Sequence, residues 1–264
     1  MEIDERLNSL APTDHVVQCY ESEDDALARN VTRYLAIGAG RREALLVVAS
    51  ADHRAAFDRE LRTLDVDVDE LTNEGLYTAF DAEEMLRRFM VEGHPDALRF
   101  ETSVGAAARS ARARSHSGLR AYGEMVGVLW KNRQFPAAIR LEQLWHKLID
   151  VHTFMLFCGY PIDIFGAEFQ IGTVDALLSA HTHLLPSKPD ALLDEALERA
   201  MTEVLAERRQ RKDIDTVTAF YGRRRAAMPN AESTILWLRH SLPQHAEEVL
   251  AAAKRHYRVL AVGS

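Results

Sequence analysis

The chain has 264 residues, 47% of them hydrophobic and 27% charged, and its formal net charge is −8. This composition is typical of a globular protein with a sizeable core, and no apolar run approaches the roughly 20 residues of a membrane span. Only two cysteines occur, Cys19 and Cys158, so neither a disulfide scaffold nor a cysteine-built metal site is expected. Because the acidic N-terminus lacks the apolar core of a signal peptide, we expect a cytoplasmic protein.

The negative charge is concentrated in the first part of the chain. Residues 1–189 carry 20 Lys and Arg against 29 Asp and Glu, whereas residues 190–264 carry 12 against 11. An acidic main body argues against nucleic-acid binding. The last part contains two basic clusters, at residues 208–212 and 223–225, which we interpret as solvated faces.

Strand and helix patterns alternate along the first two thirds of the sequence. Residues 1–13 are polar and expected to be mobile. Apolar or alternating runs predict strands at 14–20, 44–49, 75–80, 119–123 and 153–160. Helices are predicted from a cap at Ser22 to Gly38–Gly40, from about Asp52, after a cap at Asp81, and over 99–115, 125–130 and 136–148. This alternation predicts an α/β fold with three layers, in which helices cover both faces of a mostly parallel sheet.

The pattern becomes entirely helical after Pro186. We expect a main domain over residues 14–186 and an all-helical C-terminal extension over 187–264. Helices are predicted at about 190–205, from 230 to about 239 and from 241 to about 257. Apolar residues recur every three or four positions along the last two helices, which predicts a homodimer through this extension. These residues are Ile235, Leu238, Leu242, Ala246, Val249 and Ala253.

Polar residues follow each predicted strand, where ligands bind in doubly wound sheets. They are Tyr20 after the first strand, Ser50 and His53 after the second, Asp81 after the third, Glu124 after the fourth, Tyr160 after the fifth, and His181 about twenty residues later. We interpret Ser50 and Asp81 as helix caps. Glu124 follows Gly123 in a tight strand-to-helix turn and is predicted to face the crevice.

Other conspicuous residues have structural interpretations. Glu142 lies in an apolar helix and is interpreted as an ion-pair partner of Arg140 or of a neighbouring residue, while Trp130 and Trp145 are assigned to the core. His181-Thr-His183 has the spacing of a metal-binding pair, but no cysteine or carboxylate lies at ligand spacing. We therefore expect structural histidines and no metal.

Several kinds of catalytic chemistry lack their motifs. The sequence contains neither a Gly-x-Ser-x-Gly elbow nor a Gly-x-x-x-x-Gly-Lys-Ser/Thr phosphate loop. Where such a loop would follow the first strand, the chain reads Tyr20-Glu-Ser-Glu-Asp-Asp-Ala, whose carboxylates would repel phosphates. We accordingly predict no catalytic residue and assign no cofactor.

Six segments together resemble the MEDS family of sensory domains, in order and in spacing, over about residues 13–186. They are His15–Tyr20, Leu45–Ala49 with Asp52-His53-Arg54, Gly75-Leu-Tyr with Asp81-Ala82, Tyr122–Val126, Ala138–Trp145 and Phe157–Pro161, and His181 also fits. The resemblance implies a RecA/KaiC-type core that has lost its phosphate loop. It also implies sensing of small organic molecules, simple hydrocarbon derivatives among them, in prokaryotic signalling and transcriptional control.

The leading hypothesis is therefore a cytoplasmic small-molecule sensor without a membrane or nucleic-acid partner. The expected ligand-binding residues are Tyr20, His53, Glu124, Tyr160 and His181, with His15, Trp130, Glu142 and Trp145 in support. Ligand binding would change how the C-terminal helices select a signalling protein or a second copy of the chain. Two alternatives stay open. One is a degenerate RecA-like nucleotide-binding protein or residual ATPase with Glu124 as general base or Mg²⁺ ligand, and the other is a scaffold that binds no ligand.

Overall fold

The computed structural model describes residues 3–21, 26–205 and 228–262. The chain forms two compact units, one of residues 1–18 and 22–161 and the other of residues 19–21 and 162–264. The predicted cap at Ser22 and both basic clusters, 208–212 and 223–225, lie outside the described residues.

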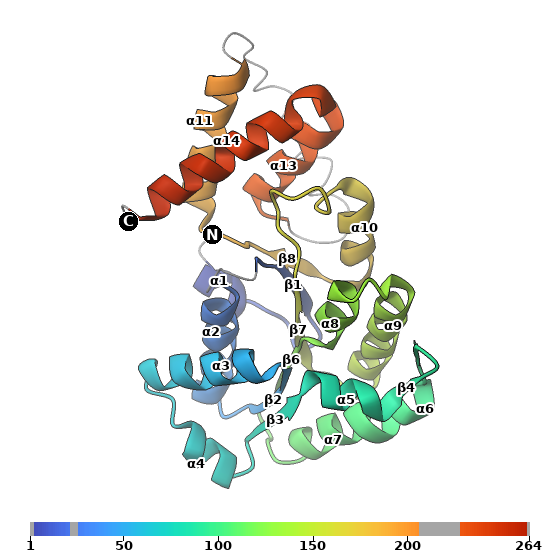
Figure 1. The fold of residues 1–264 in the computed structure, drawn as a ribbon. Coiled ribbons are helices and arrows are strands. Elements are labelled where there is room, and N and C mark those ends of the chain that lie inside the picture. Colours follow the sequence, from blue (N-terminus) through green and yellow to red (C-terminus); the bar gives the residue numbers. More distant parts are fainter. Residues whose placement is uncertain (1–2, 22–25, 206–227, 263–264) are drawn as a thin grey trace. The chain divides into compact units, whose positions relative to one another are not determined.

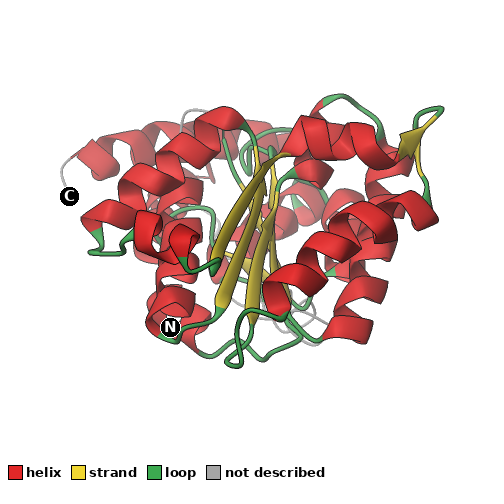
Figure 2. Cartoon of the chain, turned by 90° about the horizontal axis from the view of Figure 1, so that it is seen from below, coloured by secondary structure: helices red, strands yellow, loops and turns green. Residues whose placement is uncertain are grey.

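Six strands form one sheet in the order β3-β2-β6-β7-β1-β8. Their bounds are β1 His15–Cys19, β2 Ala44–Ala49, β3 Tyr77–Asp81, β6 Leu119–Gly123, β7 Met155–Tyr160 and β8 His183–Leu185. The pairs β2–β3, β2–β6 and β6–β7 are parallel. Figure 2 shows the strands as a central layer between helices, so the predicted α/β fold with a parallel sheet is confirmed.

Helices cover both faces of the sheet in the first unit. Figure 1 shows α1, α2 and α3 on one face and α5, α7, α8 and α9 on the other. The helices are α1 Ile3–Asn8, α2 Ala26–Gly40, α3 Ala51–Thr63, α4 Val68–Asn73, α5 Ala82–Phe89, α6 Ala97–Phe100, α7 Ala106–Arg112, α8 Met125–Lys131 and α9 Phe135–His152. A short hairpin of β4 (Met90–Val91) and β5 (His94–Pro95) follows α5.

The predicted strands form because their apolar runs are covered on two sides. All residues of β2, β6 and β7 are buried, as expected for inner strands of a parallel sheet. The predicted caps are also confirmed, since Ser50 accepts a hydrogen bond from the His53 N–H and Asp81 accepts one from the Glu84 N–H. These caps fix where α3 and α5 begin, directly after β2 and β3.

Two segments differ from the sequence-based description. The helix expected over 99–115 contains a π-helical turn, η1 (Glu101–Gly105), between α6 and α7. A Cβ atom at Gly105 would lie 2.8 Å from the Glu101 carboxyl carbon, so this glycine makes room for that side chain. In the segment expected to be mobile, residues 3–8 form α1, whose Leu7 side chain is fully buried.

A charged pair is buried at the amino end of β6. The Arg120 Nε donates to the Glu43 carboxylate, and the Arg120 guanidinium lies 4.9 Å from the centre of the Tyr34 ring. Arg120 is completely buried and Glu43 is nearly so. A Cβ atom at Gly38 would lie 2.7 Å from Arg120 Cδ, so the glycine in α2 leaves space for the long arginine side chain.

The second unit consists mainly of helices, namely α10 Ile171–Ala180, α11 Asp190–Leu205, α13 Asn230–Ser241 and α14 Pro243–Val262. Helices α11, α13 and α14 pack on one another. Five of the six apolar residues expected at a dimer interface are buried within the chain, namely Ile235, Leu238, Ala246, Val249 and Ala253. A homodimer stays a prediction, and its interface would use other side chains.

Polar networks also order the second unit. Lys254 on α14 donates to Glu21 at 3.0 Å and to Asp163 at 2.6 Å. The buried Glu232 carboxylate accepts hydrogen bonds from the backbone and the hydroxyl of Ser187, both at 3.0 Å. These bonds attach α13 and α14 to the loops around residues 163 and 187.

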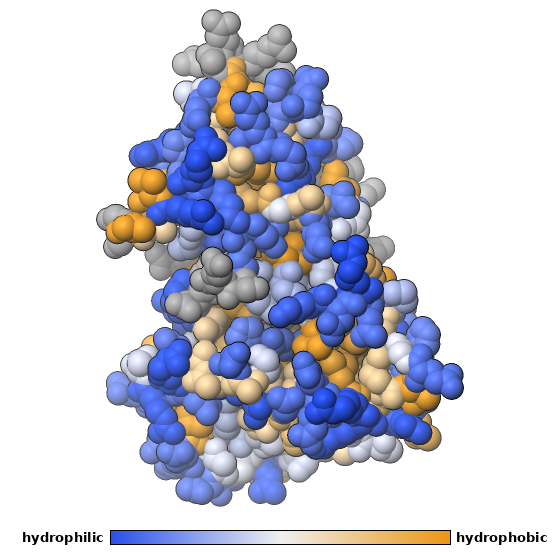
Figure 3. All heavy atoms as spheres, viewed as in Figure 1, coloured by the Kyte–Doolittle hydropathy of each residue, from blue (hydrophilic) through white to orange (hydrophobic). Residues whose placement is uncertain are grey.

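Polar side chains dominate the surface. On the face in Figure 3, hydrophilic residues cover most of the area and apolar areas are scattered among them. The most exposed large apolar residues are Leu98 on α6, Val151 on α9, and Val259 and Val262 on α14. Among the described residues, every helix is too short or too polar to span a bilayer.

Candidate functional site

The connections of the sheet change direction between β2 and β6. These strands are parallel neighbours, with Val48 opposite Gly123 at their carboxyl ends. After β2 the chain continues through α3 to β3 on one side, and after β6 it continues through α8 to β7 on the other. In open α/β sheets, such a reversal of direction is where ligands bind. The residues that follow β2 and β6 are therefore the first candidates for a binding site.

Glu124 reaches from the end of β6 to the start of α3. Its N–H donates to the Val48 carbonyl at 2.9 Å, which holds the residue against the end of β2. Its carboxylate accepts the Ser50 N–H at 2.9 Å and lies 3.4 Å from the Ser50 hydroxyl. A carboxylate at a helix N-terminus is favoured by the helix dipole. The side chain is only 7% exposed, so these hydrogen bonds hold a nearly buried carboxylate, and its role in ligand binding stays a prediction.

His53 completes this arrangement from the first turn of α3. Its Nδ1 lies 2.9 Å from Glu124 Oε1, and its ring stacks on buried Phe57 with a centroid distance of 5.8 Å. The hydrogen bond with Glu124 raises the pKa of His53 above its usual 6.5, and burial opposes this effect only in part. His53 is 28% exposed and Glu124 only 7%, so the imidazole is the more accessible of the two groups.

A second polar pair follows the neighbouring strand. Arg54 on α3 donates to Asp81 at the end of β3, at 3.1 Å. The Glu84 N–H hydrogen bond and the Arg54 charge lower the pKa of Asp81 despite a smaller opposing effect of burial. Asp81 is thus both the cap of α5 and the ion-pair partner of Arg54.

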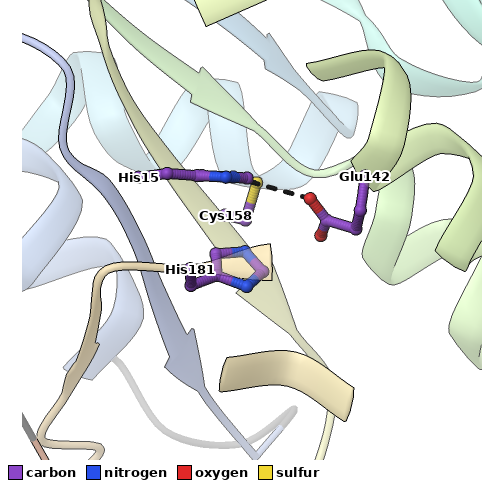
Figure 4. A group of neighbouring side chains, drawn as sticks. All are labelled: His15, Glu142, Cys158 and His181. Atoms are coloured by element: carbon purple, nitrogen blue, oxygen red, sulfur yellow. Dashed lines mark hydrogen bonds and ion pairs between the residues drawn. The ribbon is translucent and has the colours of Figure 1, made fainter. Parts of the chain in front are cut away.

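A separate buried cluster lies in the interior of the first unit, as Figure 4 shows for His15, Glu142 and Cys158. His15 Nε2 lies 3.2 Å from the Cys158 Sγ and 3.5 Å from Glu142 Oε2. The Tyr160 hydroxyl donates to Glu142 Oε1 at 2.7 Å. Burial, with a smaller contribution from the Glu142 charge, raises the pKa of the Cys158 thiol well above its usual range. This cluster joins β1, β7 and α9.

The partners of Glu142 correct one sequence-based interpretation. Arg140, the expected ion-pair partner, donates instead to Gln143 at 3.1 Å. Residues two positions apart point to different sides of a helix, so Glu142 faces the sheet while Arg140 does not. The partners of Glu142 are Tyr160 and His15, which come from two strands of the sheet.

Both predicted aromatic supports pack near these groups. Trp130, at the end of α8, makes an edge contact with Tyr160 at a centroid distance of 5.3 Å. Trp145 is fully buried and makes an edge contact with Phe100 at 5.5 Å. A Cβ atom at Gly123 would lie 3.4 Å from the Trp145 ring, an ordinary van der Waals contact, so the ring packs directly on the residue before Glu124.

The remaining expected ligand-binding residues belong to the second unit. Tyr20 follows β1 and is partly exposed. His181 follows α10, is buried, and its Nδ1 lies 2.7 Å from the Leu177 carbonyl oxygen. Within the first unit, the structure therefore joins His53 with Glu124, and Tyr160 with Glu142 and His15.

Two surface hollows of the first unit lie elsewhere. One of about 670 Å³ is lined by residues of α3, α4 and their connection, including Arg62, Asp67 and Glu70. The other, of about 620 Å³, borders β3 and is lined among others by Tyr77 and Arg114. Neither includes His53 or Glu124, and the chemistry of these two residues, not the size of a hollow, identifies the candidate site.

Comparison with known proteins gives a family assignment. The model of the MEDS family, described as the methanogen/methylotroph, DcmR sensory domain, matches residues 14–183. The chain belongs to the MEDS family. This assignment confirms the resemblance in the sequence and supports a general role in sensing and signalling. The search of curated proteins and the search of solved structures each returned no match.

The MEDS match extends from the residue before β1 to the first residue of β8. It therefore includes His53 and Glu124 as well as the cluster around Glu142. Sequence reasoning missed the role of Cys158, and it recognised Ser50 only as a cap. The contact of Ser50 with Glu124 depends on β2 and β6 being neighbours, which the structure shows and the sequence does not.

Proposed function

We propose that this MEDS protein is a sensor in which a small polar organic molecule binds at the carboxyl ends of β2 and β6. His53 contacts a hydroxyl or carboxyl group of this ligand, and Glu124 sets the orientation and charge of the imidazole. The observation that carries the proposal is the 2.9 Å contact between the His53 Nδ1 and Glu124 Oε1 at the topological reversal of the sheet. The family assignment supports the sensory role.

The pair suits recognition better than nucleophilic catalysis. A partly exposed imidazole beside a buried carboxylate offers a hydrogen-bond donor whose orientation is already fixed. Preorganisation of this kind reduces the entropy lost on binding, which matters for a ligand with few atoms. Since the pKa of His53 is raised, part of the population is positively charged near neutral pH, which favours carboxylates and other electron-rich groups.

The test is a thermal-shift screen of the full chain with short alcohols and short carboxylic acids. Ligands that bind the native state raise the melting temperature in a concentration-dependent way. We expect Glu124→Gln and His53→Gln to abolish the shift produced by any positive compound. Glu84→Gln, the same chemical change at an exposed ion pair on α5, should leave the shift unchanged.

Two results would contradict the proposal. One is a ligand-induced shift that survives both Glu124→Gln and His53→Gln. The other is tight binding of ATP with Mg²⁺ that depends on Glu124, measured by isothermal titration calorimetry, which would support the nucleotide-binding alternative.

We further propose that ligand binding changes the choice of a protein partner by the C-terminal helices. The support is the exposed end of α14, where Val259 and Val262 are 71% and 91% exposed. A sensor needs a surface that a partner protein binds differently in the ligand-free and the ligand-bound states. Apolar side chains at the end of a helix provide contact area for such a partner. Size-exclusion chromatography with and without a screened ligand tests whether that partner is a second copy of the chain.

A further inference from the structure

We propose that His15, Glu142 and Cys158 form a binding site for Zn²⁺ in the interior of the first unit. Each residue comes from a different element, namely β1, α9 and β7. Their ligand atoms, an imidazole nitrogen, a carboxylate oxygen and a thiol sulfur, all lie within 4.8 Å of one another. Nitrogen, oxygen and sulfur are the three donor types that bind Zn²⁺ in proteins.

The distances match the edges of a zinc coordination polyhedron. Bond lengths of about 2.0–2.3 Å and tetrahedral angles place neighbouring donor atoms about 3.4–3.6 Å apart. His15 Nε2 lies 3.2 Å from the Cys158 Sγ and 3.5 Å from Glu142 Oε2. A cation at the centre of this group would therefore require only small shifts of the side chains.

The charges also suit a divalent cation. Coordination of Zn²⁺ removes the proton of the Cys158 thiol, which passes to the solvent, and leaves His15 neutral with its Nε2 as the donor atom. One thiolate and one carboxylate then balance the two positive charges, so the buried site becomes neutral overall. This balance is favourable because an uncompensated charge in the interior is costly.

Tyr160 orients the Glu142 carboxylate through a hydrogen bond, as residues around a metal site commonly orient the metal ligands. Its hydroxyl donates to Glu142 Oε1 at 2.7 Å, while Oε2 of the same carboxylate faces His15. The two carboxylate oxygens therefore have different partners: Oε1 accepts the hydrogen bond from Tyr160, and Oε2 points toward the proposed metal position. All four side chains are at most 5% exposed, so the geometry is held by packing on every side.

The experiment titrates the full chain, freed of metal by dialysis against a chelator, with Zn²⁺ in competition with a coloured chelating indicator. We expect one equivalent of Zn²⁺ per chain and release of one thiol proton. Cys158→Ser, Glu142→Gln and His15→Gln should each weaken binding by at least about tenfold. Co²⁺ serves as the second probe, because its bond with a thiolate gives a charge-transfer absorption that requires Cys158.

Cys19→Ser is the matched control for the thiol, since Cys19 is buried and unpaired with another cysteine, like Cys158. It should preserve both the Zn²⁺ affinity and the Co²⁺ absorption. Circular dichroism of each metal-free variant separates loss of a ligand from loss of the fold, and Glu142→Gln replaces Cys158→Ser if the latter does not fold. Absence of stoichiometric Zn²⁺ binding would overturn the proposal and leave a hydrogen-bonded triad. Binding that survives Cys158→Ser and Glu142→Gln would overturn it as well.

Discussion

His53 and Glu124 are 71 residues apart in the sequence, yet their side chains meet with Nδ1 of the imidazole 2.9 Å from Oε1 of the carboxylate. The contact forms because β2 and β6 are parallel neighbours that end at the same edge of the sheet. One residue comes from the first turn of α3 and the other from the turn that precedes α8. The distance between the two side chains therefore depends on the positions of both α3 and α8.

The first prediction concerns the pH dependence of this pair. The hydrogen bond with Glu124 raises the pKa of His53, so protonated His53 stabilises the folded state. This contribution is complete below 6.5, the usual pKa, and is lost as the pH rises through the raised value. NMR titration of the His53 ring should give a pKa above 6.5 in the wild type and a lower pKa in Glu124→Gln. An unchanged pKa in Glu124→Gln would show that Glu124 is not the cause, and Glu84→Gln should have no effect.

The second prediction concerns the buried pair of Arg120 and Glu43. Arg120→Met leaves the Glu43 carboxylate in the interior without its guanidinium partner and should lower the free energy of unfolding by about 3–5 kcal/mol. The double variant Arg120→Met with Glu43→Leu removes both charges and should recover most of this loss. Urea unfolding gives the free energy of unfolding of the wild type, the single variant and the double variant. A loss below about 1 kcal/mol in the single variant would mean that water or another group compensates the carboxylate.

The third prediction compares two glycines in helices. A Cβ atom at Gly127 in α8 would lie 2.6 Å from the Gly159 carbonyl oxygen, which belongs to the backbone of β7 and cannot move away easily. Gly127→Ala should therefore lower the free energy of unfolding by about 1–3 kcal/mol. At Gly40, the last residue of α2, a Cβ atom would meet no atom within 4 Å. Gly40→Ala should raise the free energy of unfolding by about 0.4–1 kcal/mol. Equal effects of the two changes in denaturant unfolding would contradict the close packing of α8 on β7.

The fourth prediction concerns Lys254 in the second unit. Burial alone would raise the pKa of Asp163, but the hydrogen bonds from Lys254 and from the Phe165 N–H outweigh this effect and lower it. The stabilisation from Asp163 is therefore present above its usual pKa of 3.8 and is lost as the pH falls through the lowered value. Lys254→Met should cost about 1 kcal/mol near neutral pH, because both partners are partly exposed, and almost nothing in strong acid.

The control for Lys254→Met is Arg258→Met, which removes an exposed cation from the same helix. Denaturant unfolding at several pH values compares the two variants with the wild type. A stability loss in Lys254→Met that is independent of pH would assign the effect to the packing of the lysine stem and not to its charge.

The central strands could be predicted from the sequence because they are short, continuous apolar runs. Ala44–Ala49 and Leu119–Gly123 match the predicted bounds of β2 and β6, and both are buried on two faces. The position of Glu124 followed from the glycine before it and the apolar helix after it. The hairpin β4–β5 and the π-helical turn at Glu101–Gly105 were not predicted, because two-residue strands and one wide turn leave no periodic signal.

The cluster around Glu142 was beyond sequence reasoning for a different reason. His15 and Cys158 are 143 residues apart and meet only because β1 lies next to β7 in the sheet. Spacing along the chain contains no information on strand order, so the sequence assigned no partner to Cys158. The same limit explains why the partners proposed for Glu142 were Arg140 or a neighbouring residue, whereas its partners in the structure come from two strands.

Helix α8 is only seven residues long, and its two ends belong to different sites. Glu124 directly precedes the helix and contacts His53. Trp130 near the end of the helix packs on Tyr160, whose hydroxyl donates to Glu142. A helix of this length, about 10 Å, moves as a rigid body. A shift of about one ångström at one end of α8 would therefore also displace the residues at its other end. If binding at each site displaces α8, the two proposed sites would be thermodynamically linked. The organic ligand would then change the affinity for Zn²⁺ by the same factor by which Zn²⁺ changes the affinity for the organic ligand.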